Sequence, residues 1–464
     1  MIWILTGTGV ASAIVYGLNF RIIPLLSRVG LVDPKTDPLA AYPFLCALLF
    51  GLYLLALVSI LRKRSRSSSL GVILGFALLF RIILLFMPQV LSSDVYRYVW
   101  DGRVQSAGIN PYASPPEADA LRFLRDERIF PLINRPWAPT IYPPGAQILF
   151  AGMYQLFPDS IVGLKFIMLC FDLATIVLIM RLLKKTKIDP DRVLLYAWSP
   201  LVLFELAGSG HLEALMLPFV LLALAARTKG RAVLAGGALG VATLIKLYPA
   251  VLFPALYQRR DIRFPLTFGL IVLLGYVPYV AGAGIKVIGF LPGYIQPPED
   301  FNVGLRYFLS LALTPFAASP RILSMFILAT CLLLFALRLI LKAGSLDPYR
   351  KGYLMAGAYM LLLPTSFHPW YLVWLLPFLC LFPSWGWLYL SAAISLSYLT
   401  YTNEHFDFPL TIRFAEFLPL YLLLLLQALW HRRTARHVRM ATQDAQPATS
   451  RPEQLPGVIP EVER

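Results

Sequence analysis

Two carboxylates, Asp94 and Asp101, lie at the start of a polar segment (residues 92–142) that is rich in charge, aromatic rings and proline. This segment directly follows the apolar run 70–91, so Asp94 falls where a membrane-spanning helix would leave the hydrocarbon. A carboxylate at that depth is costly unless it has a function. If the stretch is helical, the seven-residue spacing puts both carboxylates on one face, with Arg97 one turn from each. Both are therefore candidate catalytic residues.

A purely structural explanation of these residues stays open. Asp94 could supply negative charge to the first turn of a helix capped by Ser92 or Ser93. Asp101 could simply pair with Arg97. A position at the membrane surface is compatible with both readings.

A second group of titratable residues surrounds a Gly-Ser-Gly break between two apolar stretches, in the sequence FELAGSGHLEALML (204–217). Glu205, His211 and Glu213 gather at this break. Three titratable groups around a turn within the membrane indicate a function, whereas a histidine hydrogen-bonded for packing is the alternative. The His-x-Glu pattern gives too few ligands for a typical zinc site.

Three further side chains with basic groups lie in or beside apolar sequence. His368, in LPTSFHPWYLVWLLP, stands at the end of an apolar run, and its imidazole could donate to a phosphate oxygen. Lys246 and Arg306 could each balance a lipid phosphate, or could extend to the membrane surface with no further role.

Composition predicts the elements that must position these residues. The 464 residues are 58% hydrophobic and only 14% charged, which is typical of a polytopic helical membrane protein. Because backbone polar groups cannot stay unpaired in lipid, the long apolar runs predict helices, and a β-barrel would show short alternating segments instead. We expect an all-α bundle of roughly eleven to fourteen spanning or re-entrant helices over residues 1–431. A basic and then disordered cytoplasmic tail (432–464) follows.

Two parts of this bundle are expected to be irregular. The apolar segments 143–157 and 161–183 have no basic loop between them, so one of them is expected to be a half-helix or interfacial. The run 232–257 carries three glycines, and Lys246 lies in its middle, so it is expected to break.

The distribution of charge argues against a nucleic-acid partner and predicts an orientation. Most of the basic excess behind the net charge of +16 lies in short loops between apolar runs, which is the positive-inside pattern of cytoplasmic loops. The clusters lie at 62–66, 181–192, 227–231, 259–263, 338–351 and 432–439. Segment 92–142, with six Arg against six acids, belongs outside. Segment 283–302, the turn at His368 and the loop 402–407 follow it to the same face.

At these residues the chain resembles the glycosyltransferase-C superfamily, and within it the bacterial polyprenyl-phosphate-mannose-dependent mannosyltransferases. The resemblance covers residues 80–383. It rests on the order of SSDVYRYVWDGRVQSAGINPY, TIYPPGAQ, GSGHLEA, LIKLYP and FHPWYLVWLLP. It implies a multi-pass enzyme of the cell (inner or plasma) membrane whose active face is extracytoplasmic, with 92–142 as the large first outer loop.

The resemblance also implies roles for the candidate residues. Asp94 matches the acid that acts as general base in an inverting single displacement, taking the proton of an acceptor hydroxyl while the polyprenyl phosphate leaves. Cations near the phosphate would hold its charge. The implied substrate-binding residues are Arg97, Tyr98, Glu205, His211, Glu213, Lys246, Arg306 and His368. Many members carry paired acids in the base motif, whereas Val95 follows Asp94 here, so no cofactor is certain and use of a divalent metal stays open.

We therefore expect transfer of a monosaccharide, namely mannose, from a polyprenyl-phosphate-linked donor to a hydroxyl of a lipid or glycan acceptor in cell-envelope glycan assembly. Membrane lipids are expected partners, and nucleic acid is not. The alternatives are a transporter or flippase of lipid-linked saccharides and a non-catalytic membrane partner in glycan assembly. A transporter would need polar residues through the full membrane depth, whereas these gather at one face.

Overall fold

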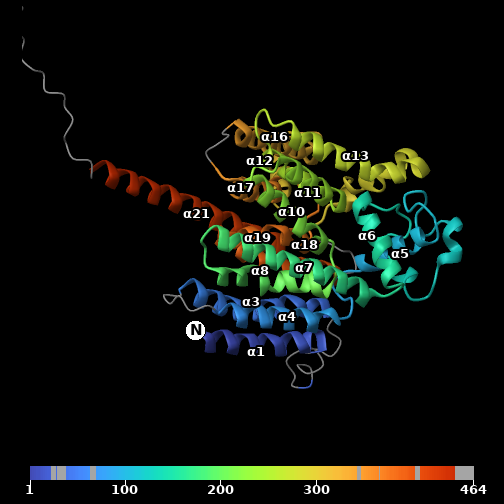
Figure 1. Cartoon of the computed structure of the whole chain (residues 1–464), viewed down its shortest axis with the longest axis horizontal. Helices are drawn as coiled ribbons and strands as arrows, with labels where there is room; N and C mark the ends of the chain where they lie inside the picture. Colours follow the sequence, from blue (N-terminus) through green and yellow to red (C-terminus); the bar gives the residue numbers. More distant parts are fainter. Residues whose placement is uncertain are drawn as a thin grey trace, which may run out of the picture.

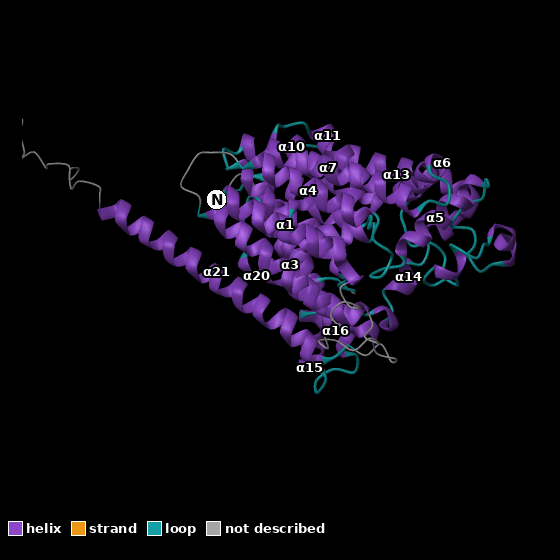
Figure 2. Cartoon of the chain, turned by 90° about the horizontal axis from the view of Figure 1, so that it is seen from below, coloured by secondary structure: helices purple, strands orange, loops and turns teal. Residues whose placement is uncertain are grey.

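Helices account for 77% of the chain in the computed structural model, as expected where lipid cannot satisfy backbone polar groups. The structure describes residues 1–21, 28, 38–62, 69–341, 346–364, 366–402 and 408–444. Within these ranges there is no β-strand, only one isolated bridge between Phe301 and Ser366. The chain is thus an all-α polytopic membrane protein, which confirms the predicted fold class (Figures 1 and 2).

The helices of the first half are α1 (Ile2–Leu18), α3 (Pro38–Leu61), α4 (Leu70–Leu85), α5 (Asp94–Ser106), α6 (Pro144–Leu156), α7 (Ile161–Lys185), α8 (Leu194–Ala197), α9 (Pro200–Val202), the π-helix η5 (Leu203–Gly208), α10 (Glu213–Thr228) and α11 (Ala232–Ile245). Those of the second half are α12 (Phe253–Leu256), α13 (Arg263–Ala283), α14 (Leu291–Tyr294), α15 (Leu305–Leu313), α16 (Pro320–Leu341), α17 (Pro348–Leu362), α18 (Pro369–Leu372), α19 (Leu376–Leu379), α20 (Trp385–Ala393) and α21 (Leu410–Asp444). Short 3-10 turns connect several of them, and the last and longest, η10 (Ile394–Thr402), precedes α21.

Five segments of the described chain are long and apolar enough to cross a membrane. They are α3, α7, α13 with its extension to Tyr294, α16 and the part of α21 up to Thr434. A bent pair, 200–208 and 213–228, makes six if it forms one span. Full-length spans are therefore fewer than the eleven to fourteen spanning or re-entrant helices expected, because several apolar runs fold as shorter helices such as α1, α4 and α11.

The irregular stretches predicted from the sequence are confirmed. The helix after the polar segment, α6, has only 13 residues, whereas α7 has 25 and is long enough to span. The run 232–257 breaks at Lys246, where α11 ends and a 3-10 turn leads into α12. The Gly-Ser-Gly break bends the chain by 118° between the π-helix η5 and α10.

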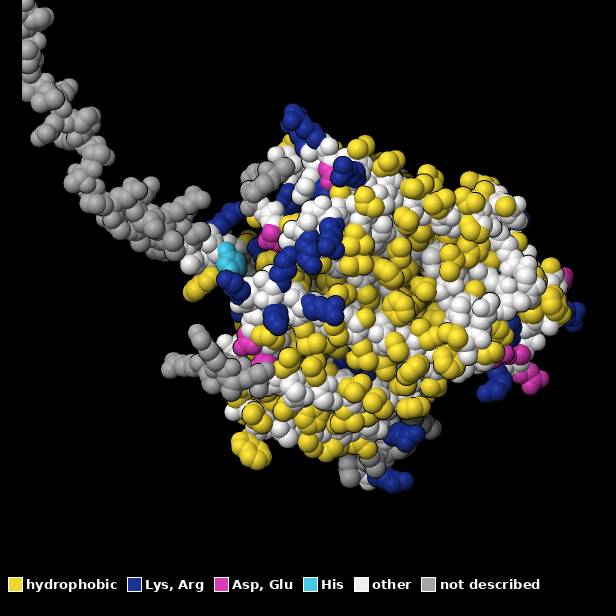
Figure 3. All heavy atoms as spheres, in the orientation of Figure 1, with side chains coloured by type: hydrophobic (Ala, Val, Ile, Leu, Met, Phe, Trp, Pro, Cys, Tyr) yellow, Lys and Arg dark blue, Asp and Glu magenta, His cyan; other side chains and the backbone are white. Residues whose placement is uncertain are grey.

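Charged side chains divide the surface into two ends separated by an apolar belt. Figure 3 shows Lys and Arg side chains gathered at the end where α21 leaves the bundle, and hydrophobic side chains covering the middle. In the same orientation, α5 and α6 occupy the opposite end (Figure 1). The polar segment and the basic loops therefore lie at opposite ends of the helices, as the alternation of loops predicted.

The C-terminal part of α21 runs beyond the bundle into the basic stretch that starts the expected tail. The helix continues to Asp444, and residues 445–464 of that tail lie outside the described residues. Most of the expected outer loop 402–407 lies outside them as well.

A buried ion pair fixes α4, the helix that leads to the polar segment. The Arg81 guanidinium donates to the Asp172 carboxylate of α7 at 2.6 Å and to the carbonyl of Ala197 at 2.7 Å. Tyr196 donates to the other oxygen of Asp172 at 2.6 Å. Arg81 is 0% exposed, so each charge depends on these partners.

Removing one member of this pair should destabilise the protein far more than removing both. We expect Arg81→Met to lower the thermal unfolding midpoint strongly in detergent, because breaking a buried pair costs roughly 3–5 kcal/mol. The double variant with Asp172→Leu should recover most of that loss, since no uncompensated charge remains. An Arg81→Met protein as stable as the wild type would contradict this account.

Candidate active site

The first turn of α5 presents Asp94, because the helix begins at that residue. The Asp94 backbone N–H donates to the Ser92 hydroxyl at 3.2 Å, which is a local contribution to the start of the helix. The other end of the helix is held by Arg103, which donates to Asp126 and Asp159 at 2.7 and 2.6 Å. These contacts tie α5 to the loop behind it and so fix the position of Asp94.

Asp101 is part of the structural framework, and the pairing alternative is confirmed for it. Arg97 donates to Asp101 at 2.8 Å within the helix. The second oxygen of Asp101 accepts from Thr140 at 2.7 Å and from Gln147 at 2.8 Å. With its carboxylate enclosed and 1% of the residue exposed, Asp101 does not reach the cavity described next.

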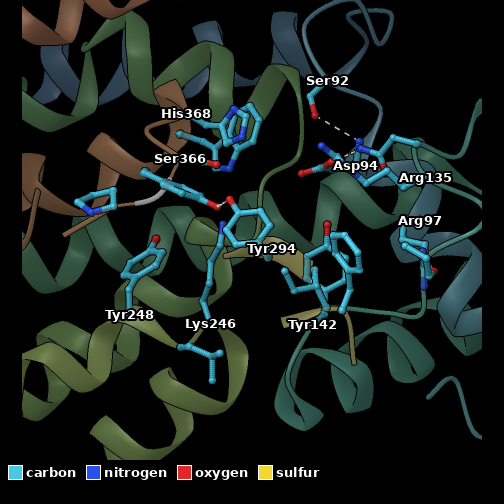
Figure 4. A pocket seen from close by; sticks show the side chains of 18 of the residues that line it. Ser92, Asp94, Arg97, Arg135, Tyr142, Lys246, Tyr248, Tyr294, Ser366 and His368 are labelled. Atoms are coloured by element: carbon cyan, nitrogen blue, oxygen red, sulfur yellow. Dashed lines mark hydrogen bonds between the residues drawn. The ribbon is translucent and has the colours of Figure 1, made fainter. Parts of the chain in front are cut away.

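A cavity of about 900 Å³ lies beside Asp94. Figure 4 shows Asp94, Arg97 and Arg135 on one side of it and Tyr248 and His368 on the other. Its polar lining residues are Gln89, Ser92, Ser93, Asp94, Arg97, Asn134, Arg135, Lys246, Ser366 and His368, and its aromatic ones are Tyr142, Tyr248, Phe290, Tyr294, Tyr359, Trp370, Tyr371 and Tyr401. Leu91, Leu291, Ile295, Met325 and Leu363 add an apolar part. The cavity is therefore lined by both charged and apolar side chains.

The Asp94 carboxylate is mostly buried, with 17% of its side chain exposed, and it has two polar neighbours. Asn134 donates to its Oδ1 at 2.6 Å. Its Oδ2 lies 3.8 Å from Nδ1 of His211. Burial raises the pKa of the Asp94 carboxyl, while the Asn134 hydrogen bond and the positive charge of Lys246 oppose this rise. A raised pKa makes the ionised carboxylate a stronger proton acceptor.

His211 follows the Gly-Ser-Gly break and is completely buried. Gly210 has a φ of 76°, a backbone conformation that favours glycine, and it turns the chain back toward α5. The His211 Nε2 lies 3.3 Å from Oε2 of Glu205, and Oε1 of Glu205 accepts from the Tyr398 hydroxyl at 3.0 Å. Neither His211 nor Glu205 lines the cavity. The break therefore places these two groups behind Asp94.

Lys246 stands where α11 ends, with its ammonium group between acidic and aromatic neighbours. It donates to Glu213, the first residue of α10, whose carboxylate also accepts from Tyr248 at 2.9 Å. The ammonium group lies 4.8 Å from the ring centre of Tyr371, a cation–π distance. Glu213 is 0% exposed, whereas Lys246 lines the cavity, so the lysine presents its charge to any bound anion.

A column of stacked rings forms another part of the wall. His211 stacks on Trp370 at 4.0 Å, and His368 stacks on the other side of Trp370 at 4.4 Å. Phe301 continues the column against His368 at 4.5 Å. Burial and the nearby charge of Arg135 lower the pKa of His368 to about 3, so its imidazole is neutral at physiological pH.

Tyr98 and Arg306, like Glu205, His211 and Glu213, were predicted to contact substrate but do not line the cavity. Tyr98 is 0% exposed and packs its ring on Phe150 at 4.8 Å, because it points into the helix packing of α5 on α6. Arg306, at the start of α15, pairs with Asp300 at 2.7 Å and is absent from the cavity lining. Both helices present these side chains away from the cavity, and contact of the two residues with substrate stays a prediction.

Sequence reasoning missed Asn134 and Arg135, which lie 40 residues and more beyond Asp94 in the polar segment. Arg135 has a φ of 49°, which turns the chain at this point. It pairs with Glu299 at 2.7 Å and lines the cavity. The Asn-Arg-Pro sequence is a turn signal, but nothing local says that the turn faces Asp94.

In the described part of the chain, no three His, Cys, Asp or Glu side chains gather closely enough to hold one metal ion.

The all-α bundle and the polar cavity at one end of it, lined by a carboxylate and cations, place the protein among integral membrane proteins with a buried polar site. Comparison with known families identifies the family. Residues 8–258 match the family described as "Alpha-(1->6)-mannopyranosyltransferase, N-terminal domain", and the chain belongs to this family of membrane mannosyltransferases. No curated protein matches the chain, and no solved structure matches it. Membership makes the protein an enzyme of mannosyl transfer, with a sugar donor and an acceptor.

We expect the His368 imidazole to remain neutral between about pH 5 and pH 8, because burial and nearby positive charge disfavour its protonation. In protein labelled with ¹³C and ¹⁵N at histidine, its NMR signals, assigned by their loss in His368→Gln, should not titrate over this range. A transition near pH 6.5 would contradict the burial that the structure gives this ring.

Proposed function

We propose that the protein transfers mannose from a polyprenyl-phosphate-linked donor to a hydroxyl group of a lipid or glycan acceptor, with Asp94 as general base. The observation that carries this proposal is the placement of Asp94 in the wall of a 900 Å³ cavity that also contains cations and an apolar side. A donor with a charged phosphate, a polar sugar and a hydrocarbon chain needs these three kinds of surface together.

The proposed step is a single displacement. The acceptor oxygen forms a bond to the anomeric carbon as the bond between that carbon and the phosphate oxygen breaks. Asp94 takes the hydroxyl proton, and the polyprenyl phosphate leaves with the bonding electron pair. Because such a displacement inverts the anomeric carbon, the α-linkage in the family's description would require a β-linked donor.

Lys246 and Arg135 are the proposed partners of the phosphate. Both line the cavity with Asp94, and their positive charges would stabilise the leaving group as its negative charge develops. The neutral His368 imidazole can donate one hydrogen bond to a phosphate or sugar oxygen, and its Nδ1 is buried without a hydrogen-bond partner among the described residues. A phosphate is already a good leaving group, so this account requires no strong acid.

The site is proposed to face the extracytoplasmic side of the cell membrane. Support comes from the gathering of basic side chains at the opposite end of the bundle (Figure 3), since basic loops concentrate on the cytoplasmic side. A cysteine introduced at Trp137, which is 52% exposed and precedes the cavity-lining Ala138, should react with a membrane-impermeant thiol reagent in intact cells or spheroplasts. A cysteine at Lys185 should react only after the membrane is opened.

Replacing Asp94 by Asn should lower the rate of product formation about 10²- to 10⁴-fold, because the amide cannot accept the proton. The assay uses purified protein with polyprenyl-phospho-mannose and a glycolipid acceptor. Binding of the donor should change little, since the cations and the apolar wall are kept. Full activity of Asp94→Asn would remove Asp94 as the base, and no product from any donor with wild-type protein would favour a flippase or a non-catalytic partner.

The pH dependence of the rate should report the Asp94 carboxyl. Burial raises the pKa of the Asp94 carboxyl. As the pH decreases, the base should therefore become protonated, and activity should fall, at a pH above the range in which an ordinary Asp titrates. Asn134→Ala removes a hydrogen bond that stabilises the ionised form, so this acid limb should move up by about one pH unit. An unchanged acid limb in Asn134→Ala would show that another group controls it.

A further inference from the structure

His211 lies between two carboxylates that come from different elements. Its Nδ1 is 3.8 Å from Oδ2 of Asp94 on α5, and its Nε2 is 3.3 Å from Oε2 of Glu205 in the π-helix η5. His211 and Glu205 are both 0% exposed. The Asp94 distance is longer than a hydrogen bond, and neither His211 nitrogen makes a hydrogen bond among the described residues. Such contacts commonly shorten and align when substrate completes the site.

The number of protons shared by His211, Asp94 and Glu205 determines which nitrogen of His211 carries an N–H. A neutral imidazole has one N–H and one lone pair, and a lone pair facing a carboxylate oxygen is repelled. Three arrangements with the same number of protons avoid this repulsion: an imidazolium between two carboxylates, a neutral imidazole whose Nε2 accepts a proton held by Glu205, and a neutral imidazole whose Nδ1 accepts a proton held by Asp94. When Asp94 is ionised to act as base, only the first two remain, and in both Nδ1–H faces Asp94.

The surrounding fold prevents the ring from turning away. His211 stacks on Trp370 with an interplanar angle of 17°, and Trp370 stacks on His368 at 2°. Tyr398 donates to both oxygens of Glu205, at 3.0 and 3.2 Å, and so fixes the carboxyl that faces Nε2. A ring held in this way keeps Nδ1 near Asp94 and Nε2 near Glu205.

We propose that His211 is a positioning residue for Asp94, and that Glu205, held by Tyr398, fixes its tautomer. This inference rests on the proposed role of Asp94 as general base. A donor at Oδ2 together with Asn134 at Oδ1 holds the carboxylate in one orientation and favours its ionised form. His211 and Glu205 are thus separated from the substrate and act through Asp94.

Other charged and titratable groups near Asp94 also affect its ionisation, so the test must separate them from His211. They are Arg97 on α5, Arg135 in the polar segment, Lys246 after α11, Glu213 on α10, and the tyrosines Tyr98, Tyr142, Tyr294 and Tyr401. None of these is altered in the variants below.

The experiment compares pH profiles of kcat/KM in the full-length protein. His211→Phe keeps an aromatic ring against Trp370 but has no N–H, so the acid limb should move to higher pH and kcat should fall at least tenfold with little change in KM. Glu205→Gln retains an amide N–H that can donate to Nε2 and should keep the wild-type acid limb. Glu205→Leu has no such donor and should reproduce the shift of His211→Phe.

Ser209→Ala is the matched control, because Ser209 is buried in the same turn and its hydroxyl has no hydrogen-bond partner among the described residues. Its profile should equal that of the wild type. Thermal unfolding in detergent identifies variants that do not fold, and if His211→Phe is among them, the difference between Glu205→Gln and Glu205→Leu decides.

The outcomes separate this inference from the function on which it rests. An inactive Asp94→Asn together with a wild-type acid limb in folded His211→Phe, or with equal limbs in Glu205→Gln and Glu205→Leu, overturns the positioning role and leaves the base in place. A fully active Asp94→Asn overturns both. The shift in His211→Phe and Glu205→Leu, absent from Glu205→Gln and Ser209→Ala, supports the positioning role.

Discussion

An ionised group inside an apolar bundle costs several kcal/mol unless donors or opposite charges surround it, and this constraint governs the arrangement of the whole polar end. Two buried acids there show how neighbouring donors offset this cost. Asp101 is enclosed by Arg97 and two neutral donors, and Glu213 is held by Lys246 and Tyr248. Among the described acids at this end, Asp94 combines partial burial, a single short donor and access to the cavity. These features support the proposal that Asp94 is the group that exchanges a proton.

Breaks in the helices are what allow so many polar groups to meet. A continuous helix satisfies its own backbone and presents side chains along its length, whereas a helix end leaves backbone groups and side chains free to face a site. The start of α5, the bend at Gly210, the end of α11 at Lys246 and the turn before α18 all fall at one end of the bundle. The cavity lies where these ends converge.

Mannosyl transfer fits the division of the cavity into unlike surfaces. A flat aromatic wall, cations and an apolar side correspond to the sugar, the phosphate and the lipid chain of the proposed donor. The ring column from His211 to Phe301 adds rigidity, because stacked rings in a packed interior have few alternative rotamers. Rigid placement matters because displacement at an anomeric carbon requires the base, the acceptor and the leaving group to be aligned.

By itself the sequence determined the membrane class, the helical composition, the break at the Gly-Ser-Gly turn and the break at Lys246. Each of these follows from local hydrophobicity, charge or glycine content, which a short window of residues contains. Only the tertiary structure decided that Asp101 is enclosed, that Arg306 pairs with Asp300 away from the cavity, and that Asn134 and His211 flank Asp94. Those outcomes depend on how helices distant in the chain pack together and on which face each turns inward, and local chemistry does not specify either.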